Sequence, residues 1–186
     1  MALKNEIAIF GGGCFWCTEA IFENLAGVRS VMSGYAGGKT ENPTYNKIHN
    51  GESDHVEVIQ IDFNPDQIPY DDLLTVFFAS HDPTTPNRQG SDIGPQYRSL
   101  ILYTNDSQKL SAEKFIEKLN KSTPEGQPII TEIKPLTKFY PAEDYHQDFY
   151  RRNPEQPYCQ VVINPKLEKL QKEFANLLKS HDKNHQ

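Results

Sequence analysis

The hydrophobic and polar positions of this chain repeat with two periods, one typical of strands and one typical of helices. The clearest strand covers residues 54–63 and stops at Asn64-Pro65. The clearest helix follows, with five large apolar residues spaced to share one buried face: Tyr70, Leu73, Leu74, Phe77 and Phe78. Further strands are expected at 7–10, 28–34, 97–103 and 128–133, and further helices just after Cys14 and at 106–119, 141–152 and 164–180.

Strands and helices are interspersed without an internal repeat, a low-complexity tract or a linker. This arrangement predicts a single α+β domain over residues 1–186, a two-layer sandwich in which helices pack on a mixed sheet. The C-terminal helix at 164–180 is expected to be capped by Asn164, and the polar end at 181–186 is expected to fray. Two long loops, at 36–51 and 81–96, are rich in Gly, Pro and Asn, and loops of that length are often functional.

The composition narrows the classes of function. The chain has 186 residues, a formal net charge of -6 and a pI of ≈ 5.5, which argue against nucleic-acid binding. No apolar run is long enough for a membrane helix, and the first residues lack the apolar part of a signal peptide, so we expect a cytoplasmic protein. Three cysteines cannot form a closed set of structural disulfides, which favours redox or catalytic use.

The chemistry is expected to centre on Cys14. The apolar run at 7–10 and the glycines at 11–13 precede it, and an apolar helical spacing follows it, with Gly27 as the helix stop. A cysteine where a strand turns into a helix meets free backbone amides and the positive end of the helix dipole. Both favour the thiolate, so we expect a lowered pKa and a reactive thiol. The alternative is a small buried residue without chemistry.

Glu57 lies in the clearest strand, where its side chain shares a face with Ile59, Ile61 and Phe63. If this face is the core side, burial raises the pKa of the carboxyl and makes it a proton donor near neutral pH. If the opposite face points inward instead, Glu57 is solvated. The pattern by itself leaves both alternatives open.

The string Gly13-Cys14-Phe15-Trp16-Cys17-Thr18-Glu19 resembles the active-site signature of the A-type peptide methionine sulfoxide reductases. Further stretches resemble the same family in the same order: 34–38, 42–45, 51–57, 81–83, 89–92, 96–99 and 142–147. The resemblance covers about residues 7–159, nearly the whole chain. It implies an enzyme that reduces methionine S-sulfoxide, free or in proteins, to methionine and so repairs oxidised protein. We expect no cofactor.

The resemblance also implies roles for single residues. Glu57 matches the proton donor, and Phe15 and Trp16 match the aromatic pair that lines the pocket for the methyl group of the substrate. Three further residues match the polar groups of the site: Tyr45, Asp92 and Tyr97. Without the resemblance, the aromatic pair would be assigned to the core, Tyr97 to the edge of a strand and Asp92 to a turn.

Two cysteines compete for the role of the second thiol. Cys17 is one helical turn from Cys14, with the C-x-x-C spacing of thioredoxin-like redox motifs, but burial would raise its pKa and make it attack poorly. Cys159 follows a proline-rich stretch that resembles the segment carrying the resolving cysteine in many family members. The chain departs from the commoner family pattern at Cys17, where glycine is frequent, and in its C-terminal segment. We expect Cys159 to resolve, with Cys17 as the alternative.

Thiolate attack on a protonated sulfoxide produces a sulfenic acid, which a second thiol converts to an intramolecular disulfide. The resemblance implies thioredoxin as the reductant of that disulfide. Two rivals remain, a thioredoxin-like thiol–disulfide oxidoreductase using Cys14 and Cys17, and a peptide-binding module built on Phe15 and Trp16. The six histidines lack the spacing with cysteines that a zinc site needs, so we expect no metal, and we expect His146 to be structural or to support the site. We expect a monomer.

Overall fold

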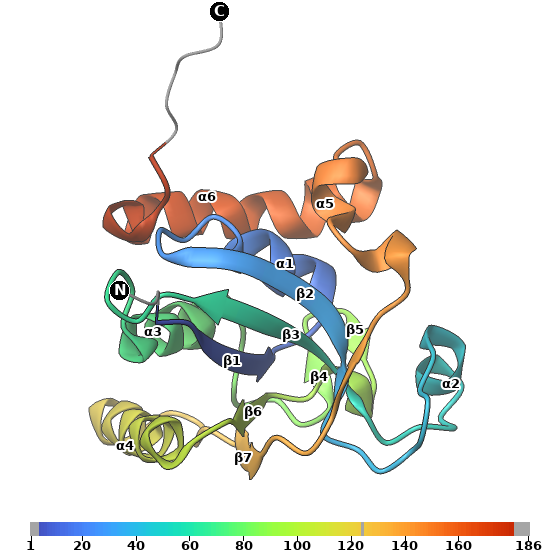
Figure 1. The fold of residues 1–186 in the computed structure, drawn as a ribbon, viewed down its shortest axis with the longest axis horizontal. Helices are drawn as coiled ribbons and strands as arrows, with labels where there is room; N and C mark the ends of the chain where they lie inside the picture. The colour runs from blue at the N-terminus through green and yellow to red at the C-terminus, as the bar shows by residue number, and fades with distance from the viewer. Residues whose placement is uncertain (1–3, 124, 181–186) are drawn as a thin grey trace, which may run out of the picture.

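One mixed sheet organises the computed structural model, which describes residues 4–123 and 125–180 (Figure 1). Its strands lie in the order β7-β6-β1-β3-β2-β8; β6 and β7 are parallel and the other pairs antiparallel. The strands are β1 (Glu6–Gly11), β2 (Val28–Ala36), β3 (Val56–Phe63), β6 (Leu100–Tyr103), β7 (Glu132–Pro135) and β8 (Phe139–Pro141). Because Phe10 of β1 faces Ile59 of β3 in an antiparallel pair, the end of β1 lies beside the start of β3.

Four of the longer helices contribute to the main core on one face of the sheet, and Ile48 from the short helix α2 (Tyr45–His49) joins them (Figure 1). The four longer helices are α1 (Phe15–Phe22), α3 (Tyr70–Ser80), α4 (Asp106–Ser122) and α6 (Asn164–Glu173). Phe10 of β1 lies at the centre of this core, with ring centroids 5.7 Å from Phe22 and 4.7 Å from Phe77. Burial of each such aromatic side chain contributes about 1.5–3 kcal/mol to folding. The end of α1 is therefore fixed against the sheet.

The opposite face of the sheet carries a smaller apolar cluster. Ile9, Val58 and Leu102 are buried there, with Leu136 and Phe139 packed against them. The segment from β7 to α5 (Phe149–Arg152) crosses this face of the molecule (Figure 1). Both faces of β3 are covered as a result, so the burial of a β3 side chain does not depend on which way it points.

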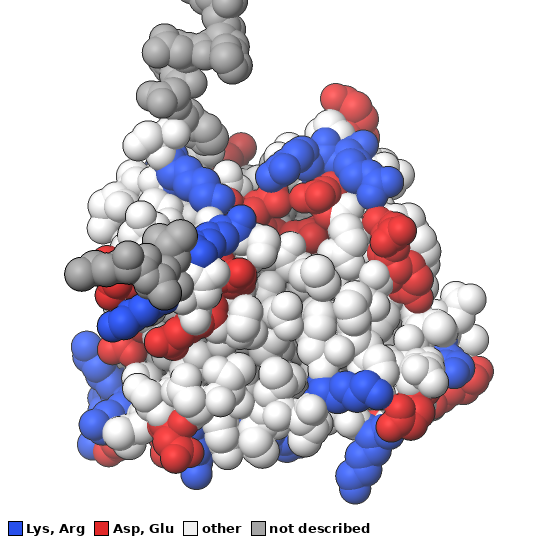
Figure 2. All heavy atoms as spheres, in the orientation of Figure 1, with Lys and Arg blue, Asp and Glu red and all other residues white. Residues whose placement is uncertain are grey.

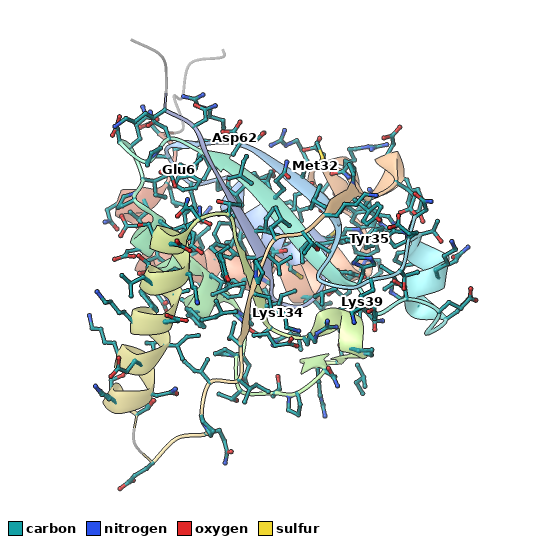
Figure 3. The ribbon with its side chains drawn as sticks, turned by 60° about the horizontal axis from the view of Figure 1, so that its bottom comes forward. Glu6, Met32, Tyr35, Lys39, Asp62 and Lys134 are labelled. Carbon is teal, nitrogen blue, oxygen red and sulfur yellow. The ribbon has the colours of Figure 1, made fainter. Side chains whose placement is uncertain are left out.

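The two ends of the sheet differ in their surroundings (Figure 3). Glu6, Asp62 and Met32, from the neighbouring strands β1, β3 and β2, lie toward the same end, while Tyr35 lies further along β2 toward α2 (Tyr45–His49). On the face seen in Figure 2, charged side chains gather around the margins and uncharged residues cover the middle.

Among the described residues, no helix is both long and apolar enough to cross a membrane.

The structure confirms the α+β class. It differs from the expectation in two segments, one expected to be a loop and one expected to be a single helix. The expected loop at 36–51 contains α2, because Thr44 caps it by accepting a hydrogen bond from the Lys47 amide. The expected helix at 141–152 is divided into η2 (Asp144–His146) and α5. Gln147 binds the backbone of Ser33 on β2, and Asp148 has a left-handed φ of 52°, so the helical run is interrupted between them.

The end of the chain also differs from the expectation. A π-helix, η3 (Cys159–Ile163), leads directly into α6, so Asn164 does not cap that helix, and its side chain accepts a hydrogen bond from Tyr150 instead. The expected helix at 164–180 ends at Glu173, and the short turn η4 (Ala175–Leu177) follows. The Lys179 amide bonds the carbonyl of Asn24 at 2.9 Å, which draws this end against the turn after α1. The expected fraying at 181–186 lies outside the described residues.

Two smaller differences concern strands. The strand expected at 128–133 is β7 at Glu132–Pro135, where the Glu132 amide bonds the Ser99 carbonyl at 3.1 Å. The strand expected at 97–103 begins at Leu100, because the turn η1 (Pro95–Tyr97) precedes it. A two-stranded sheet of β4 (Arg88–Gln89) and β5 (Asp92–Ile93) lies within the expected loop at 81–96.

Candidate active site

Cys14 lies in the turn between β1 and α1, which is the placement that the sequence predicts. Its carbonyl accepts the first bonds of the helix, from the Cys17 amide at 3.1 Å and the Thr18 amide at 3.4 Å. Gly13 makes the turn with a φ of 91°, and a Cβ at this position would approach the Gln89 side chain at 2.9 Å. A glycine is therefore required immediately before the cysteine.

A pocket of ≈ 200 Å³ opens beside Cys14, and several distant segments contribute to it. Its lining consists of Cys14, Phe15, Trp16, Tyr45, Glu57, Asp92, Tyr97 and Tyr158. The structure thus brings together the nucleophile, the acid, the aromatic pair and the three polar residues that the sequence singled out. Tyr158 is an addition; its position next to Cys159 was the one sequence signal that could have pointed to it.

The Glu57 carboxyl is buried at the floor of the site, with 2% of the residue exposed. Its neighbours Val56 and Val58 are also buried, toward the smaller cluster on the opposite face, so the alternative of a solvated Glu57 is wrong. The carboxylate oxygen Oε2 accepts a hydrogen bond from the Phe15 amide at 3.1 Å. Burial, reinforced by the nearby Asp92 carboxylate, raises the pKa of Glu57 to about 8. Glu57 therefore carries a proton at neutral pH.

The pKa of the Cys14 thiol differs from the expectation. Burial raises it well above the ordinary value for cysteine, and hydrogen bonding to Cys17 and the Glu57 carboxylate add to the effect. The expected lowering by free amides fails because the Phe15 amide, at the start of α1, is bonded to Glu57 instead. Before substrate binds, Cys14 is therefore a protonated thiol.

Cys17 shows the opposite behaviour. Its pKa is lowered, chiefly by a hydrogen bond with Cys14, although burial acts against this. The Cys17 sulfur lies 3.6 Å from the hydroxyl of Tyr158, and that hydroxyl donates to Asp92 Oδ2 at 2.8 Å. The alternative of a raised pKa for a buried Cys17 is therefore wrong, because it counted burial without hydrogen bonding.

Cys159 shares a small buried cluster with Cys17, and Cys14 packs against the same cluster. Cys159 begins the π-helix η3 and is 0% exposed, within this cluster with Cys17, Ala20 and Ile163. Burial raises the pKa of its thiol. Cys159 does not line the pocket beside Cys14.

The aromatic pair is held by neighbours from the C-terminal part of the chain. Trp16 stacks on Phe149 with ring centroids 3.6 Å apart, and its indole Nε1 donates to His146 Nδ1 at 3.1 Å. Phe15 packs between Tyr35 and His146, at 5.7 and 5.1 Å. His146 thus positions both members of the pair, which agrees with the supporting role expected for it.

The two tyrosines on the other side of the pocket are linked by His49. The ring nitrogen Nε2 of His49 lies 3.1 Å from the Tyr97 hydroxyl and 3.5 Å from Glu57 Oε1. Burial raises the pKa of both Tyr45 and Tyr97, so their hydroxyls keep their hydrogens at neutral pH. His49 was not distinguished from the other histidines in the sequence, because no motif includes it.

Comparison with known proteins identifies the family. The family model described as peptide methionine sulfoxide reductase matches residues 6–178. This chain belongs to that family. The peptide methionine sulfoxide reductase MsrA of Acinetobacter baumannii (strain AYE) is 54% identical over 173 residues, which cover 93% of this chain and 98% of the relative. The MsrA of Sulfolobus acidocaldarius is 52% identical over 171 residues, covering 92% and 96%.

Solved structures of methionine sulfoxide reductases share the fold. Reduced Mxr1 from Saccharomyces cerevisiae matches with a TM-score of 0.76 and 33% identity, over 86% of this chain and 91% of that one. Methionine sulfoxide reductase A of Corynebacterium diphtheriae matches with a TM-score of 0.71 and 34% identity, over 81% and 76%. The chain is thus an oxidoreductase that carries out thiol-dependent reduction of methionine sulfoxide. The family assignment favours this function over the thiol–disulfide oxidoreductase and the peptide-binding module.

Proposed function

We propose that Cys14 and Glu57 perform this reduction as nucleophile and acid. The Cys14 sulfur attacks the sulfoxide sulfur while Glu57 passes its proton to the sulfoxide oxygen. The hydroxyl then moves to the Cys14 sulfur as the sulfur–oxygen bond of the substrate and the new sulfur–sulfur bond both break, which releases methionine and leaves Cys14 as a sulfenic acid. The proton that Cys14 gives up restores Glu57, so a thiol and a sulfoxide become a sulfenic acid and a thioether with no net uptake of protons.

The observation that carries this proposal is the shared pocket of a cysteine and a buried, protonated carboxyl. A sulfoxide oxygen leaves readily only after protonation, and Glu57, with a pKa of about 8, holds the required proton at neutral pH. Phe15 and Trp16 supply the apolar wall for the methyl group. The hydroxyls of Tyr45 and Tyr97 donate hydrogen bonds to the sulfoxide oxygen as it gains charge.

Asp92 has a different role in this proposal. Its carboxylate accepts the Tyr158 hydroxyl hydrogen and lies close enough to help raise the pKa of Glu57. Asp92 therefore acts on Glu57, whose pKa it helps to raise, and through Tyr158 on Cys17.

The geometry supports Cys17, the alternative in the sequence analysis, as the thiol that resolves the sulfenic acid. Hydrogen bonding with Cys14 lowers the pKa of Cys17, whereas Cys159 is 0% exposed, does not line the pocket and has a thiol whose pKa burial raises. Attack by Cys17 on Cys14 releases water and forms a disulfide within the first turn of α1. Cys159 lies in the cluster around Cys17, where thiol exchange with Cys17 could follow if η3 rearranges.

The reductant proposed for this disulfide is thioredoxin, acting by dithiol exchange. A structure of Mxr1 in complex with Trx2 shares the fold with a TM-score of 0.54 and 24% identity. We further propose the S epimer as the substrate, free or in proteins, a monomeric enzyme and a cytoplasmic location, where a reducing environment keeps its free cysteines reduced.

The test is a reaction without reductant. The enzyme is mixed with one equivalent of a peptide carrying either the S or the R sulfoxide, and methionine and free thiols are counted. The S epimer is expected to give methionine with the loss of a pair of thiols, and the R epimer is expected to give none. Methionine formed without thiol loss would refute the mechanism, and equal reaction of both epimers would refute the assigned substrate.

A further inference from the structure

The side chain of His49, at the end of α2, touches the catalytic site with both of its ring nitrogens. Nδ1 lies 2.9 Å from the backbone carbonyl oxygen of Tyr45. Nε2 lies 3.1 Å from the hydroxyl of Tyr97 and 3.5 Å from Glu57 Oε1. The imidazole also stacks on the Tyr45 ring, with centroids 3.8 Å apart. These contacts fix the position of the ring.

The contacts of His49 also fix its tautomer. A carbonyl oxygen can only accept a hydrogen bond, so Nδ1 carries a hydrogen whether the ring is neutral or charged. In the neutral ring Nε2 is then an acceptor, and the Tyr97 hydroxyl, the nearer of its two polar neighbours, donates to it. In the charged ring Nε2 carries a hydrogen too, and it can only donate, to the oxygen of Tyr97 or to Glu57 Oε1.

Protonation of His49 therefore reverses one hydrogen bond in the site. When the ring is neutral, the Tyr97 hydroxyl hydrogen is directed at Nε2 and away from the substrate. When the ring is charged, Tyr97 accepts from Nε2, and its own hydrogen is free to point into the pocket. His49 can exchange protons with solvent because 25% of its side chain is exposed, in contrast to 2% for Glu57.

We propose that His49 is a positioning residue of this reductase whose protonation turns the Tyr97 hydroxyl hydrogen toward the sulfoxide oxygen. The inference rests on the role proposed above for Tyr97. A charged His49 favours reduction by releasing the Tyr97 donor. It also lies next to the carboxylate that Glu57 becomes after it gives up its proton.

Other titratable groups lie around His49 and also contribute to the pH dependence of the reaction. They are Tyr45 on α2, Glu57 on β3, Tyr97 on η1, His146 on η2 with Glu143 before it, and Cys14 and Asp92 across the pocket. Burial lowers the pKa of His146, and the charge of a protonated His49 adds to this. A simple pH profile of the enzyme would therefore mix several titrations.

The experiment isolates His49 by a ratio of rates. The first turnover is measured by rapid mixing from about pH 5.5 to about 8.5, the range in which histidines titrate, for the wild type and for His49→Gln. Glutamine can hydrogen-bond to Tyr97 in either direction but does not titrate, so the ratio of the two rates cancels the titrations they share. One hydrogen bond contributes about 0.5–1.5 kcal/mol, so the ratio is expected to fall about 2- to 10-fold as pH rises.

Two further measurements make the result specific. In a Tyr97→Phe background the same ratio is expected to be independent of pH, because the hydroxyl is gone. The NMR titration midpoint of the His49 ring is expected to coincide with the midpoint of the change in the ratio. His49→Asn, a second variant that cannot titrate, is expected to behave like His49→Gln, and both are checked for a native circular dichroism spectrum.

A ratio that does not change with pH overturns the proposal, and so does an equal change in the Tyr97→Phe background, which would mean that His49 acts directly on Glu57. The failure of the underlying role is distinguishable. If Tyr97→Phe reduces sulfoxide as fast as the wild type at about pH 5.5, then Tyr97 is not a donor to the substrate. If Tyr97→Phe is slow but the ratio is constant, only the role of His49 fails.

Discussion

Replacing Glu57 with glutamine removes the proton that we assign to the sulfoxide oxygen and keeps the shape of the side chain. With a pKa of about 8, Glu57 is protonated in about nine-tenths of the molecules at pH 7. A carboxyl with the ordinary pKa of about 4.3 would be protonated in about 0.2% of them. Burial thus supplies several hundred times more of the acid form. Because general acid catalysis typically contributes ~10²–10⁴-fold, we expect the first turnover of Glu57→Gln to be slower by that factor.

The assay is the formation of methionine in a rapid-quench experiment, with dithiol reductant left out. Above about pH 8 the wild-type rate is expected to fall towards tenfold per pH unit, since the acid form of Glu57 is lost. Glu57→Gln is expected to lack this decrease. A loss of less than about threefold at pH 7, or an unchanged decrease above pH 8 in the variant, would show that the proton comes from another group.

The burial of Glu57 that favours catalysis makes the folded protein less stable as pH rises. The native state holds a proton on Glu57 up to a pKa of about 8, whereas the unfolded chain loses it near the ordinary value of about 4.3. Between these values the native state binds more protons, so the free energy of unfolding falls with rising pH, by up to about 1.4 kcal/mol per pH unit. Glu57→Gln avoids this loss. In urea unfolding it should gain stability over the wild type as pH rises to about 8, and gain none by this route below about pH 4.

Three further predictions concern the thiols. Cys14→Ser should form no methionine even in a single turnover, because a serine hydroxyl is not ionised at neutral pH; any measurable product would contradict the nucleophile assignment. Peptide mass mapping after one equivalent of sulfoxide should recover a Cys14–Cys17 disulfide, and Cys17→Ser should fail to recycle with thioredoxin; a Cys14–Cys159 bond from the wild type would restore the original expectation. Tyr158→Phe should slow disulfide formation by about 2- to 10-fold, the effect of one neutral hydrogen bond, because the Tyr158 hydrogen is already donated to Asp92 and its oxygen can only accept from Cys17. It should slow the first turnover less; equal slowing of both steps would argue against its action on Cys17.

The sequence was sufficient to predict the fold class and most elements whose apolar spacing is long and regular. The helix α3 follows five residues on one face, and the strand β3 follows a run of eight residues rich in Val, Ile and Phe that Asn64-Pro65 ends, so both appear close to their expected bounds. The pocket residues could be assigned because the strand–glycine–cysteine–helix order fixes Cys14 and the family motifs fix the others. Their meeting in space depends on the antiparallel pairing of β1 with β3, which no local pattern specifies.

The parts that could not be predicted depend on contacts between distant residues. Gln147 binds β2, more than a hundred positions away in the sequence, and this bond interrupts what would otherwise be one helix. Asn164 followed by Pro165 is a typical start of a helix, yet the π-helix η3 runs directly into α6, so no cap is needed there. The carboxyl of Glu57 could not be placed from alternation alone, because both faces of β3 are buried. His49 carries no motif, and its three polar contacts exist only in the folded protein.

The pKa values of the two neighbouring thiols follow from the way in which α1 begins. A helix start normally stabilises a thiolate with its first amides, but the Phe15 amide is bonded to Glu57, so it acts on the Glu57 carboxylate and not on Cys14. The acid must be buried to hold its proton, and the same burial raises the pKa of Cys14. Cys17, one turn along, has the lowered pKa. On the roles proposed above, the nucleophile is therefore held as a thiol, whereas the neighbouring thiol that attacks the sulfenic acid has the lowered pKa. Such a division limits oxidation of Cys14 by other oxidants and shortens the lifetime of its sulfenic acid, the form most exposed to further oxidation.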